Sequence, residues 1–232
     1  MIWPLVVSGI AFLIFASGPV VARGSGARKM GALRVSVIGA FLGLLASILA
    51  GVMLAISRDW LCGIAILIGL IPLAFILPPI ATVRLQKLPR INDVATDLVD
   101  PPVFAHAASM PENAGRNLEF PEKNRELVRK GYPDLAPLAL QGSPDEIFDR
   151  ARRAAQTMPG WAIAAADPGK RTIEASFESS VFGFVDDIIV RVRAGTSGSV
   201  IDVRSKSREG IGDFGANAAR IRAYIARVKN PI

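Results

Sequence analysis

The sequence predicts a membrane part of three transmembrane α-helices, followed by a soluble α+β domain whose antiparallel sheet carries two helices on one face. Uneven charge is the first observation, because residues 1–83 hold 5 of the 27 Lys and Arg and 1 of the 20 Asp and Glu. The hydrophobic share of 51% is the second, since it is high for a soluble protein. The third is an alternation of apolar and polar residues between positions 161 and 207, which is typical of antiparallel strands.

Three stretches without charged residues, 1–22, 35–57 and 60–83, make up the membrane part, which we place at residues 1–86. A helix of about 20 apolar residues spans the hydrocarbon core of a bilayer, so each stretch can cross once. A cleaved signal peptide is the alternative for the first stretch, but no basic residue precedes its apolar run. We therefore expect a multi-pass protein.

Basic residues beside these stretches predict the orientation. Short loops rich in Lys and Arg stay in the cytoplasm. Three crossings put the loop after the first helix and the region after the third on the same side, so the N-terminus lies outside and the C-terminal domain lies in the cytoplasm. The two basic clusters that agree on this are Arg23, Arg28, Lys29 and Arg34, and then Arg84, Lys87 and Arg90.

Small residues recur at every fourth position of the second stretch, at Gly39, Gly43, Ser47 and Gly51. This spacing places them on one helix face, where another backbone can approach closely. Two partners fit that face: another helix of the same chain, or a second copy in a homo-oligomer. The three stretches contain no Asp, Glu, Lys, Arg or His, which disfavours a transporter or channel.

The soluble part begins with an extended, Pro- and Asp-rich segment at residues 87–120, which either packs on the domain or links to it. The α+β domain itself is expected over residues 121–232. A short helix fits residues 121–130, and an edge strand interrupted by two prolines fits residues 132–140.

Two longer helices are predicted to cover the sheet. Ser143-Pro144-Asp145-Glu146 opens the first, with an N-cap Ser and a Glu three residues later. Asp213 is expected to cap the last helix. Their apolar faces match the single apolar face of the sheet. The four strands are expected at residues 161–166, 171–178, 184–193 and 200–207.

The opposite face of the predicted sheet is polar and carries charges of both signs. We expect it to meet water, with cross-strand ion pairs worth roughly 0.2–1 kcal/mol each. A docking surface for an acidic partner is the alternative. The residues of this face are Glu174, Glu178, Asp187, Arg191, Arg193, Asp202, Arg204 and Lys206.

Composition excludes several classes of function. One cysteine and one histidine leave no disulfide framework and argue against a metal site, and no P-loop or dinucleotide fingerprint is present, so no cofactor is expected. The net charge of +7 does not predict nucleic-acid binding. Residues 1–83 contribute +4 of it (5 basic, 1 acidic), which leaves +3 for the soluble part.

Four blocks of the soluble part resemble the domain-of-unknown-function 1499 family. The C-terminal block is the longest and most specific of them. The resemblance covers about residues 90–228. The blocks are INDVATD and DPPVF within 91–104, YPD and PL within 132–138, FGFVDD at 182–187, and RSKSREG, DFGAN and RI within 204–221.

The resemblance implies a small α+β domain, found in bacteria and in related plastid proteins and often attached to a membrane. It implies no activity, because the family is named for lacking one. We therefore expect a protein of the bacterial inner membrane. Some relatives look like lipoproteins with this domain outside the cytoplasm, so the periplasm is the alternative location, although this chain has no lipobox cysteine.

The function we favour is a non-catalytic domain that binds a protein partner or an anionic ligand at the membrane. The sequence does not establish an enzyme and leans against one. An enzyme that acts on an envelope-related substrate through an Asp/Arg corner is the first alternative, and binding of anionic lipid headgroups is the second. Arg204 and Arg208 are expected to point toward Asp186 or Asp187. The candidate site residues are Asp186, Asp187, Arg204, Ser205, Arg208, Asp213, Asn217 and Arg220.

Overall fold

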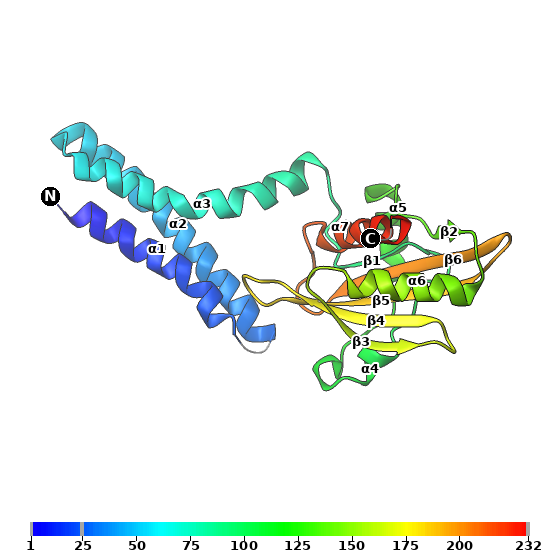
Figure 1. Cartoon of the computed structure of the whole chain (residues 1–232). Coiled ribbons are helices and arrows are strands. Elements are labelled where there is room, and N and C mark those ends of the chain that lie inside the picture. Colours follow the sequence, from blue (N-terminus) through cyan, green and yellow to red (C-terminus); the bar gives the residue numbers. More distant parts are fainter. Residues whose placement is uncertain (1, 24–25, 231–232) are drawn as a thin grey trace. The chain divides into compact units, whose positions relative to one another are not determined.

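The computed structural model describes residues 2–23 and 26–230, and these form two compact units (Figure 1). The first unit comprises residues 1–86 together with the loop 179–183, and the second comprises residues 87–178 and 184–232. The predicted fold class is confirmed, because three long apolar helices precede a domain built on an antiparallel sheet with helices.

Three helices form the first unit: α1 (Trp3–Val21), α2 (Gly26–Ser57) and α3 (Trp60–Leu85). Each is long and apolar enough to cross a membrane. α2 has 32 residues, more than a bilayer core needs, and its first turns carry Arg28 and Arg34, which the sequence had placed in a loop. α3 continues through three prolines and bends instead of ending (Figure 1).

The small residues of α2 contact the other two helices of the same chain. A Cβ atom on Gly39 would collide with the backbone of Phe15 in α1, and one on Gly43 would lie 2.6 Å from the carbonyl oxygen of Gly69 in α3. The Ser47 hydroxyl donates a hydrogen bond of 3.0 Å to the carbonyl of Ile66 in α3. A Cβ on Gly51 would lie 3.9 Å from the Ile66 side chain. The stripe is therefore filled by packing within the chain.

One antiparallel sheet organises the second unit. Its strands follow the order β1-β6-β5-β4-β3, and β2 also pairs with β6. The central strands lie where apolar and polar residues alternate in the sequence, and Asp187 of β5 lies opposite Lys206 of β6. The strands are β1 (Asp93–Ala95), β2 (Leu138–Leu140), β3 (Trp161–Asp167), β4 (Thr172–Glu178), β5 (Val185–Gly195) and β6 (Gly198–Ser207).

Helices α6 (Pro144–Gln156) and α7 (Ala216–Lys229) cover the apolar face of this sheet. α6 begins with the predicted capping box between Ser143 and Glu146. The core packs apolar residues of the helices against alternate residues of the strands. Its fully buried members include Phe148, Ala151, Ile221, Tyr224 and Val228 from the helices and Ile173, Ile188, Val190, Ile201 and Val203 from the strands.

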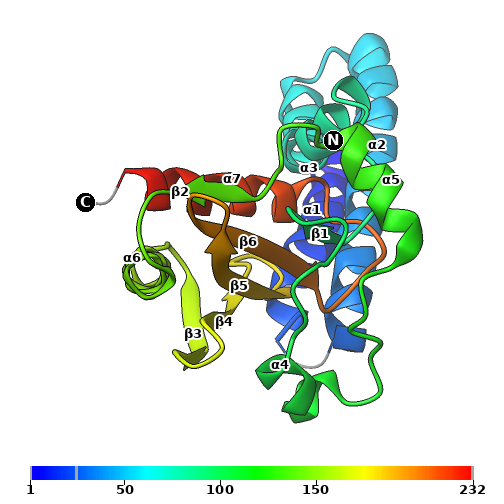
Figure 2. The same cartoon turned by 90° about the vertical axis from the view of Figure 1, so that its right-hand side faces the viewer.

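Most of the polar face of the sheet is buried, so the prediction that this face meets water is wrong for all but its ends, where Glu178 and Arg193 are exposed. Residues 96–120, which we call the strap, lie against it and carry the short helices α4 (His106–Ser109) and η1 (Pro111–Asn113). Figure 2 shows α4 and α6 on different sides of the sheet. Phe104 and Ala107 of the strap pack against Ile189 of β5. Both faces of the sheet are therefore covered.

Backbone amides of the strap explain why this face is rich in carboxylates. The buried side chain of Glu174 accepts hydrogen bonds of 2.8 Å from the amides of Ala105, His106 and Ala107. A covering segment without a strand ladder needs other acceptors for its buried N–H groups, and the carboxylate of Glu174 supplies them here. The remaining secondary element, α5 (Glu122–Gly131), follows the strap.

Candidate functional site

The eight candidate residues do not meet at one corner, because successive residues of a strand point to opposite faces of a sheet. Asp186 and Ser205 lie on the face that α7 covers, whereas Asp187 and Arg204 lie on the face that the strap covers. The residues therefore form two separate clusters, which we call the helix-side cluster and the strap-side cluster.

The helix-side cluster joins the end of the sheet to the first turns of α7. Arg220 donates a 2.6 Å hydrogen bond to the carboxylate of Asp186, and its other terminal nitrogen donates to Ser205 and Asn217. The Ser205 hydroxyl donates to the Asn217 side-chain oxygen at 2.6 Å. The Arg220 guanidinium also lies 4.4 Å from the ring centroid of Phe177. The cluster is a closed hydrogen-bond network that fixes α7 on the strands.

Asp213 holds the start of α7, but from two residues before the N-cap position. The N-cap is Gly215, and the carboxylate of Asp213 accepts from the amides of Gly215 at 2.8 Å and Asn217 at 3.0 Å. The prediction that Asp213 caps the last helix is confirmed for its carboxylate, although the residue at the N-cap position itself is Gly215. Phe214 and Gly215 both adopt positive φ angles, 55° and 86°, and this curl brings the earlier carboxylate over the helix end. These two amides are thus occupied by the protein itself.

We expect the free energy of unfolding of the Asp213→Ala variant to be about 0.5–2 kcal/mol lower than that of the wild type, as for other lost caps.

Burial raises the pKa of the Asp213 carboxyl, although the Gly215 and Asn217 amides oppose the shift. A raised pKa in the folded state means that stability falls as the pH rises from about 4 through that pKa. Asp213→Asn keeps one acceptor and should lose this pH dependence. Urea denaturation of all three proteins across pH 4–8 tests both statements, and an identical pH profile for Asp213→Asn would contradict the second.

The strap-side cluster centres on Arg204, whose side chain is 1% exposed. Its guanidinium forms a fork with the fully buried carboxylate of Asp93, at 2.9 and 2.8 Å. It also donates to the carbonyls of Pro102 and Leu118 at 3.0 and 2.7 Å. The prediction that Arg204 points toward Asp186 or Asp187 is therefore wrong, because β1 brings Asp93 closer.

Aromatic rings enclose the same guanidinium. The centroid of the Phe104 ring lies 4.8 Å from its central carbon, and that of Phe120 lies 5.3 Å away. Lys206, two residues along β6, donates to the second oxygen of Asp93 at 2.8 Å. One carboxylate thus holds two cations inside the protein, and the strap supplies the carbonyls and rings that replace water around Arg204.

Arg208 pairs with Asp187, one of the two partners expected for it. Its guanidinium donates to both carboxylate oxygens, with a shortest distance of 2.7 Å. Arg116 of the strap lies 3.3 Å from the same carboxylate and donates to the carbonyl of Ser207 at 2.9 Å. Charge-assisted hydrogen bonds therefore join this end of the sheet to the strap.

Sequence reasoning missed Asp93, Arg116 and the role of Asp202. Asp93 lies within the first family-like block, so the resemblance offered a signal that spacing did not. Fully buried Asp202 accepts hydrogen bonds from Arg191 and Arg193, at shortest distances of 2.9 and 2.7 Å. Arg116 belongs to a strap without periodicity, and no pattern in the sequence marks it.

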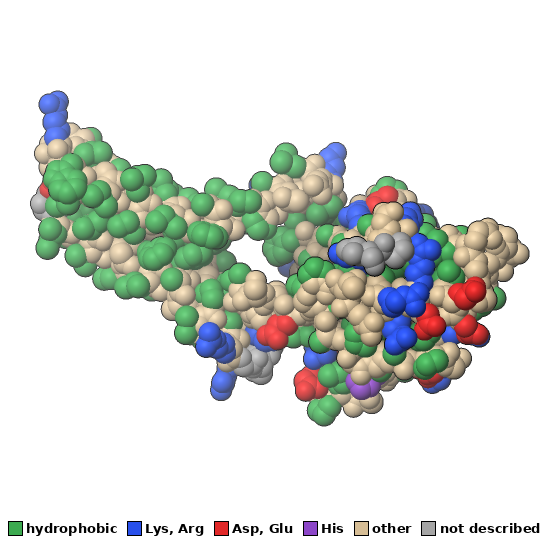
Figure 3. All heavy atoms as spheres, viewed as in Figure 1, with side chains coloured by type: hydrophobic (Ala, Val, Ile, Leu, Met, Phe, Trp, Pro, Cys, Tyr) green, Lys and Arg blue, Asp and Glu red, His purple; other side chains and the backbone are tan. Residues whose placement is uncertain are grey.

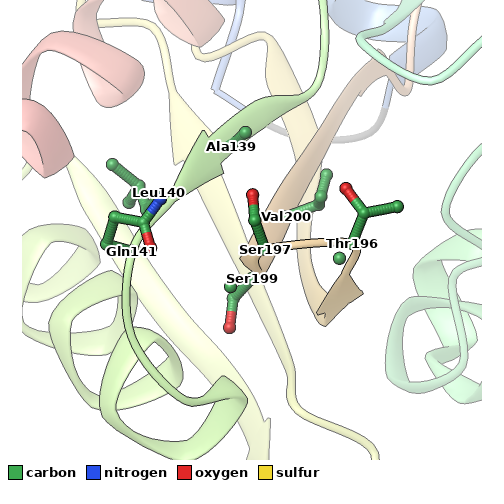
Figure 4. Close-up of a pocket in the computed structure, with 9 residues that line it drawn as sticks. Ala139, Leu140, Gln141, Thr196, Ser197, Ser199 and Val200 are labelled. Carbon is green, nitrogen blue, oxygen red and sulfur yellow. The ribbon is translucent and has the colours of Figure 1, made fainter.

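Two other kinds of site to consider are a hollow in the surface and a group of metal-ligating side chains. A hollow of about 330 Å³ lies between the end of β2 and the β5–β6 turn, lined by residues such as Leu140, Thr196 and Ser199 (Figure 4). It contains no charged residue and none of the eight candidates. Among the residues that the structure describes, no three His, Cys, Asp or Glu side chains gather as metal ligands.

The fold and its two clusters define a class of protein: a two-layer α+β domain with a strapped sheet, preceded by three apolar helices. The family described as "Protein of unknown function (DUF1499)" matches residues 93–228, more than half of the chain. The chain therefore belongs to the DUF1499 family, as the four sequence blocks indicated. A comparison with curated proteins found no match.

Proposed function

We propose that the chain is a multi-pass membrane protein that holds a non-catalytic binding domain at the bilayer. The observation that carries the proposal is the apolar surface of α1, α2 and α3 (Figure 3). Large hydrophobic side chains such as Leu13, Phe41 and Phe75 are exposed along them. In water such a surface would be strongly unfavourable, whereas in a bilayer it meets lipid.

The paired state of the candidate residues argues against a catalytic Asp/Arg corner. A catalytic Asp/Arg corner would need charged groups that face a common substrate position. Here Asp186, Asp187, Arg204, Arg208 and Arg220 are divided between two faces of the sheet, and each is engaged in an ion pair within the domain. These residues therefore stabilise the fold. The Asp/Arg corner that suggested an enzyme on an envelope-related substrate no longer supports that alternative.

Two of the four cations of α7, Arg220 and Arg222, are paired within the domain, which weakens the case for headgroup binding through this helix. Arg220 forms an ion pair with Asp186, and Arg222 forms a two-point ion pair with Asp134 at 2.6 and 2.7 Å. The Arg222 guanidinium accordingly lowers the pKa of the Asp134 carboxyl. The partner that we propose for the domain must therefore be recognised by another surface.

The proposed topology puts the N-terminus outside the bacterial inner membrane and the domain in the cytoplasm. Alkaline phosphatase fused after Ile232 should then be inactive in a bacterial host, because the enzyme folds only after export, whereas a fluorescent protein at the same site should be bright. The full chain should stay in the membrane pellet after an alkaline carbonate wash. An active phosphatase would place the domain in the periplasm, and release by carbonate would refute membrane spanning itself.

A further inference from the structure

The loop that joins β6 to α7, residues 208–215, exposes two large apolar side chains. Ile211 is 66% exposed and Phe214 is 58% exposed. Phe214 also has a φ angle of 55°, a left-handed conformation that bulky residues rarely adopt. Such a conformation is strained, and burial of the Phe214 ring does not offset the strain here. The backbone turn at Phe214 serves the contact of Asp213 with the start of α7, but the domain leaves the aromatic ring itself exposed beside Ile211.

The loop is fixed to the residues that lead from α3 into the sheet. The amide of Asp213 donates to the carbonyl of Ile91 at 3.1 Å, and the Asn92 side chain donates to the carbonyl of Gly210 at 2.6 Å. A Cβ on Gly212 would lie 3.1 Å from the side chain of Arg90. Residues 90–92 and the loop therefore move as one body.

Chain length limits how far this body can lie from the end of α3. The helix ends at Leu85, and Ile91 follows six residues later. An extended chain advances at most about 3.6 Å per residue, so Ile91 lies within about 22 Å of that helix end. This limit holds for any orientation of the domain. If α3 spans a bilayer, the loop is tethered beside the bilayer surface.

The charges of the tether fit the same surface. Arg84, Lys87 and Arg90 lie between the apolar run of α3 and the sheet. Basic residues next to a membrane span attract anionic headgroups, and apolar side chains beside them insert into the interface. An aromatic and an aliphatic residue next to three cations form the combination that interfacial anchors use.

We propose that Ile211 and Phe214 insert into the headgroup region of the bilayer that holds α1–α3, and that they dock the domain on an anionic membrane surface. This inference rests on the proposed function, because it requires α3 to span the membrane. It deepens that proposal by naming the partner of the domain as lipid. The membrane-facing surface of the domain is then the end of the sheet where β6 passes into α7.

The test uses the full chain in vesicles of phosphatidylcholine and phosphatidylglycerol. Cys62 is first replaced by alanine, and single cysteines are introduced by Ile211→Cys or Phe214→Cys and labelled with the environment-sensitive dye NBD. Val103→Cys is the matched control, since Val103 is 74% exposed but lies on the strap. We expect blue-shifted emission at positions 211 and 214, with loss of that emission when brominated lipid is included. Emission at position 103 should remain typical of water and unaffected by brominated lipid.

Each outcome separates this inference from the proposed function. Release of the labelled chain by alkaline carbonate would refute the membrane-spanning proposal and, with it, this inference. A retained chain with water-like emission at 211 and 214 would refute the docking alone. Blue-shifted emission that brominated lipid does not quench would mean that protein covers the loop, and equal quenching at 103 would mean unspecific adhesion. Either result would overturn the proposal.

Discussion

Replacing Arg204 with alanine is expected to lower the free energy of unfolding of the domain by about 3–5 kcal/mol, because it leaves a buried carboxylate without its main partner. The variant removes the fork to Asp93, the hydrogen bonds to the carbonyls of Pro102 and Leu118, and the packing between two phenylalanine rings. Lys206 is the remaining cation on Asp93, and it provides one hydrogen bond. Both the sheet and the strap lose their common anchor.

Urea denaturation of residues 88–232 measures this effect, with Trp161 as reporter because its ring stacks on Tyr224 in the core. Arg193→Ala is the matched control. Arg193 of β5 faces the strap as Arg204 of β6 does, but its side chain is 42% exposed, and its partner Asp202 keeps the ion pair with Arg191. We expect a loss below about 1 kcal/mol for the control. Equal losses in the two variants would show that Arg204 is not the anchor of the strap.

The second large effect is expected at Ile189. Ile188 and Ile189 are consecutive residues of β5 that point to opposite faces of the sheet, and both are buried. Ile188 packs in the core under α6 and α7, whereas Ile189 packs against Phe104 and Ala107 of the strap. Removing either side chain leaves a cavity, so Ile188→Ala and Ile189→Ala should each cost about 2–5 kcal/mol.

The same denaturation experiment tests this pair. A sheet with one face open to water would tolerate Ile189→Ala with a loss well below that of Ile188→Ala. Comparable losses are expected only if the strap forms a second packed layer. Deleting the contact from the other side, with Phe104→Ala, should then reduce the additional effect of Ile189→Ala, because residues in direct contact are not additive.

Local patterns were sufficient to predict the helix-covered half of the domain. The alternation at Ile173, Ala175 and Phe177 identified the face that packs on the helices, and Ser143 with Glu146 identified the start of α6. The other half could not be predicted in this way. A strand face covered by backbone amides and one covered by water both select carboxylates such as Glu174, so the strand pattern alone does not distinguish them.

The candidate site shows the same division between short-range and long-range information. Asp187 lies on β5 and Arg208 directly follows the neighbouring strand β6, and Asp187 was one of the two partners expected for Arg208. The partner of Arg204 is 111 residues earlier in the chain, on a three-residue strand that no periodicity marks. The N-cap residue of α7 is Gly215, two residues after Asp213. This shift could not be predicted, because hydrophobic spacing does not reveal the left-handed φ angles of Phe214 and Gly215.

The pairing of β1 with β6 has a consequence for folding during synthesis. Asp93 leaves the ribosome long before Lys206, its partner across the ladder. At translation rates of about 5–20 residues per second, the intervening stretch takes roughly 6–23 s to appear. Through almost all of that interval Asp93 has neither of its cations, because Arg204 and Lys206 both belong to β6. The pairing of β1 with β6 is therefore a late folding event between residues far apart in the chain. It is completed only when the last strand has emerged and Arg204 and Lys206 reach the carboxylate of Asp93.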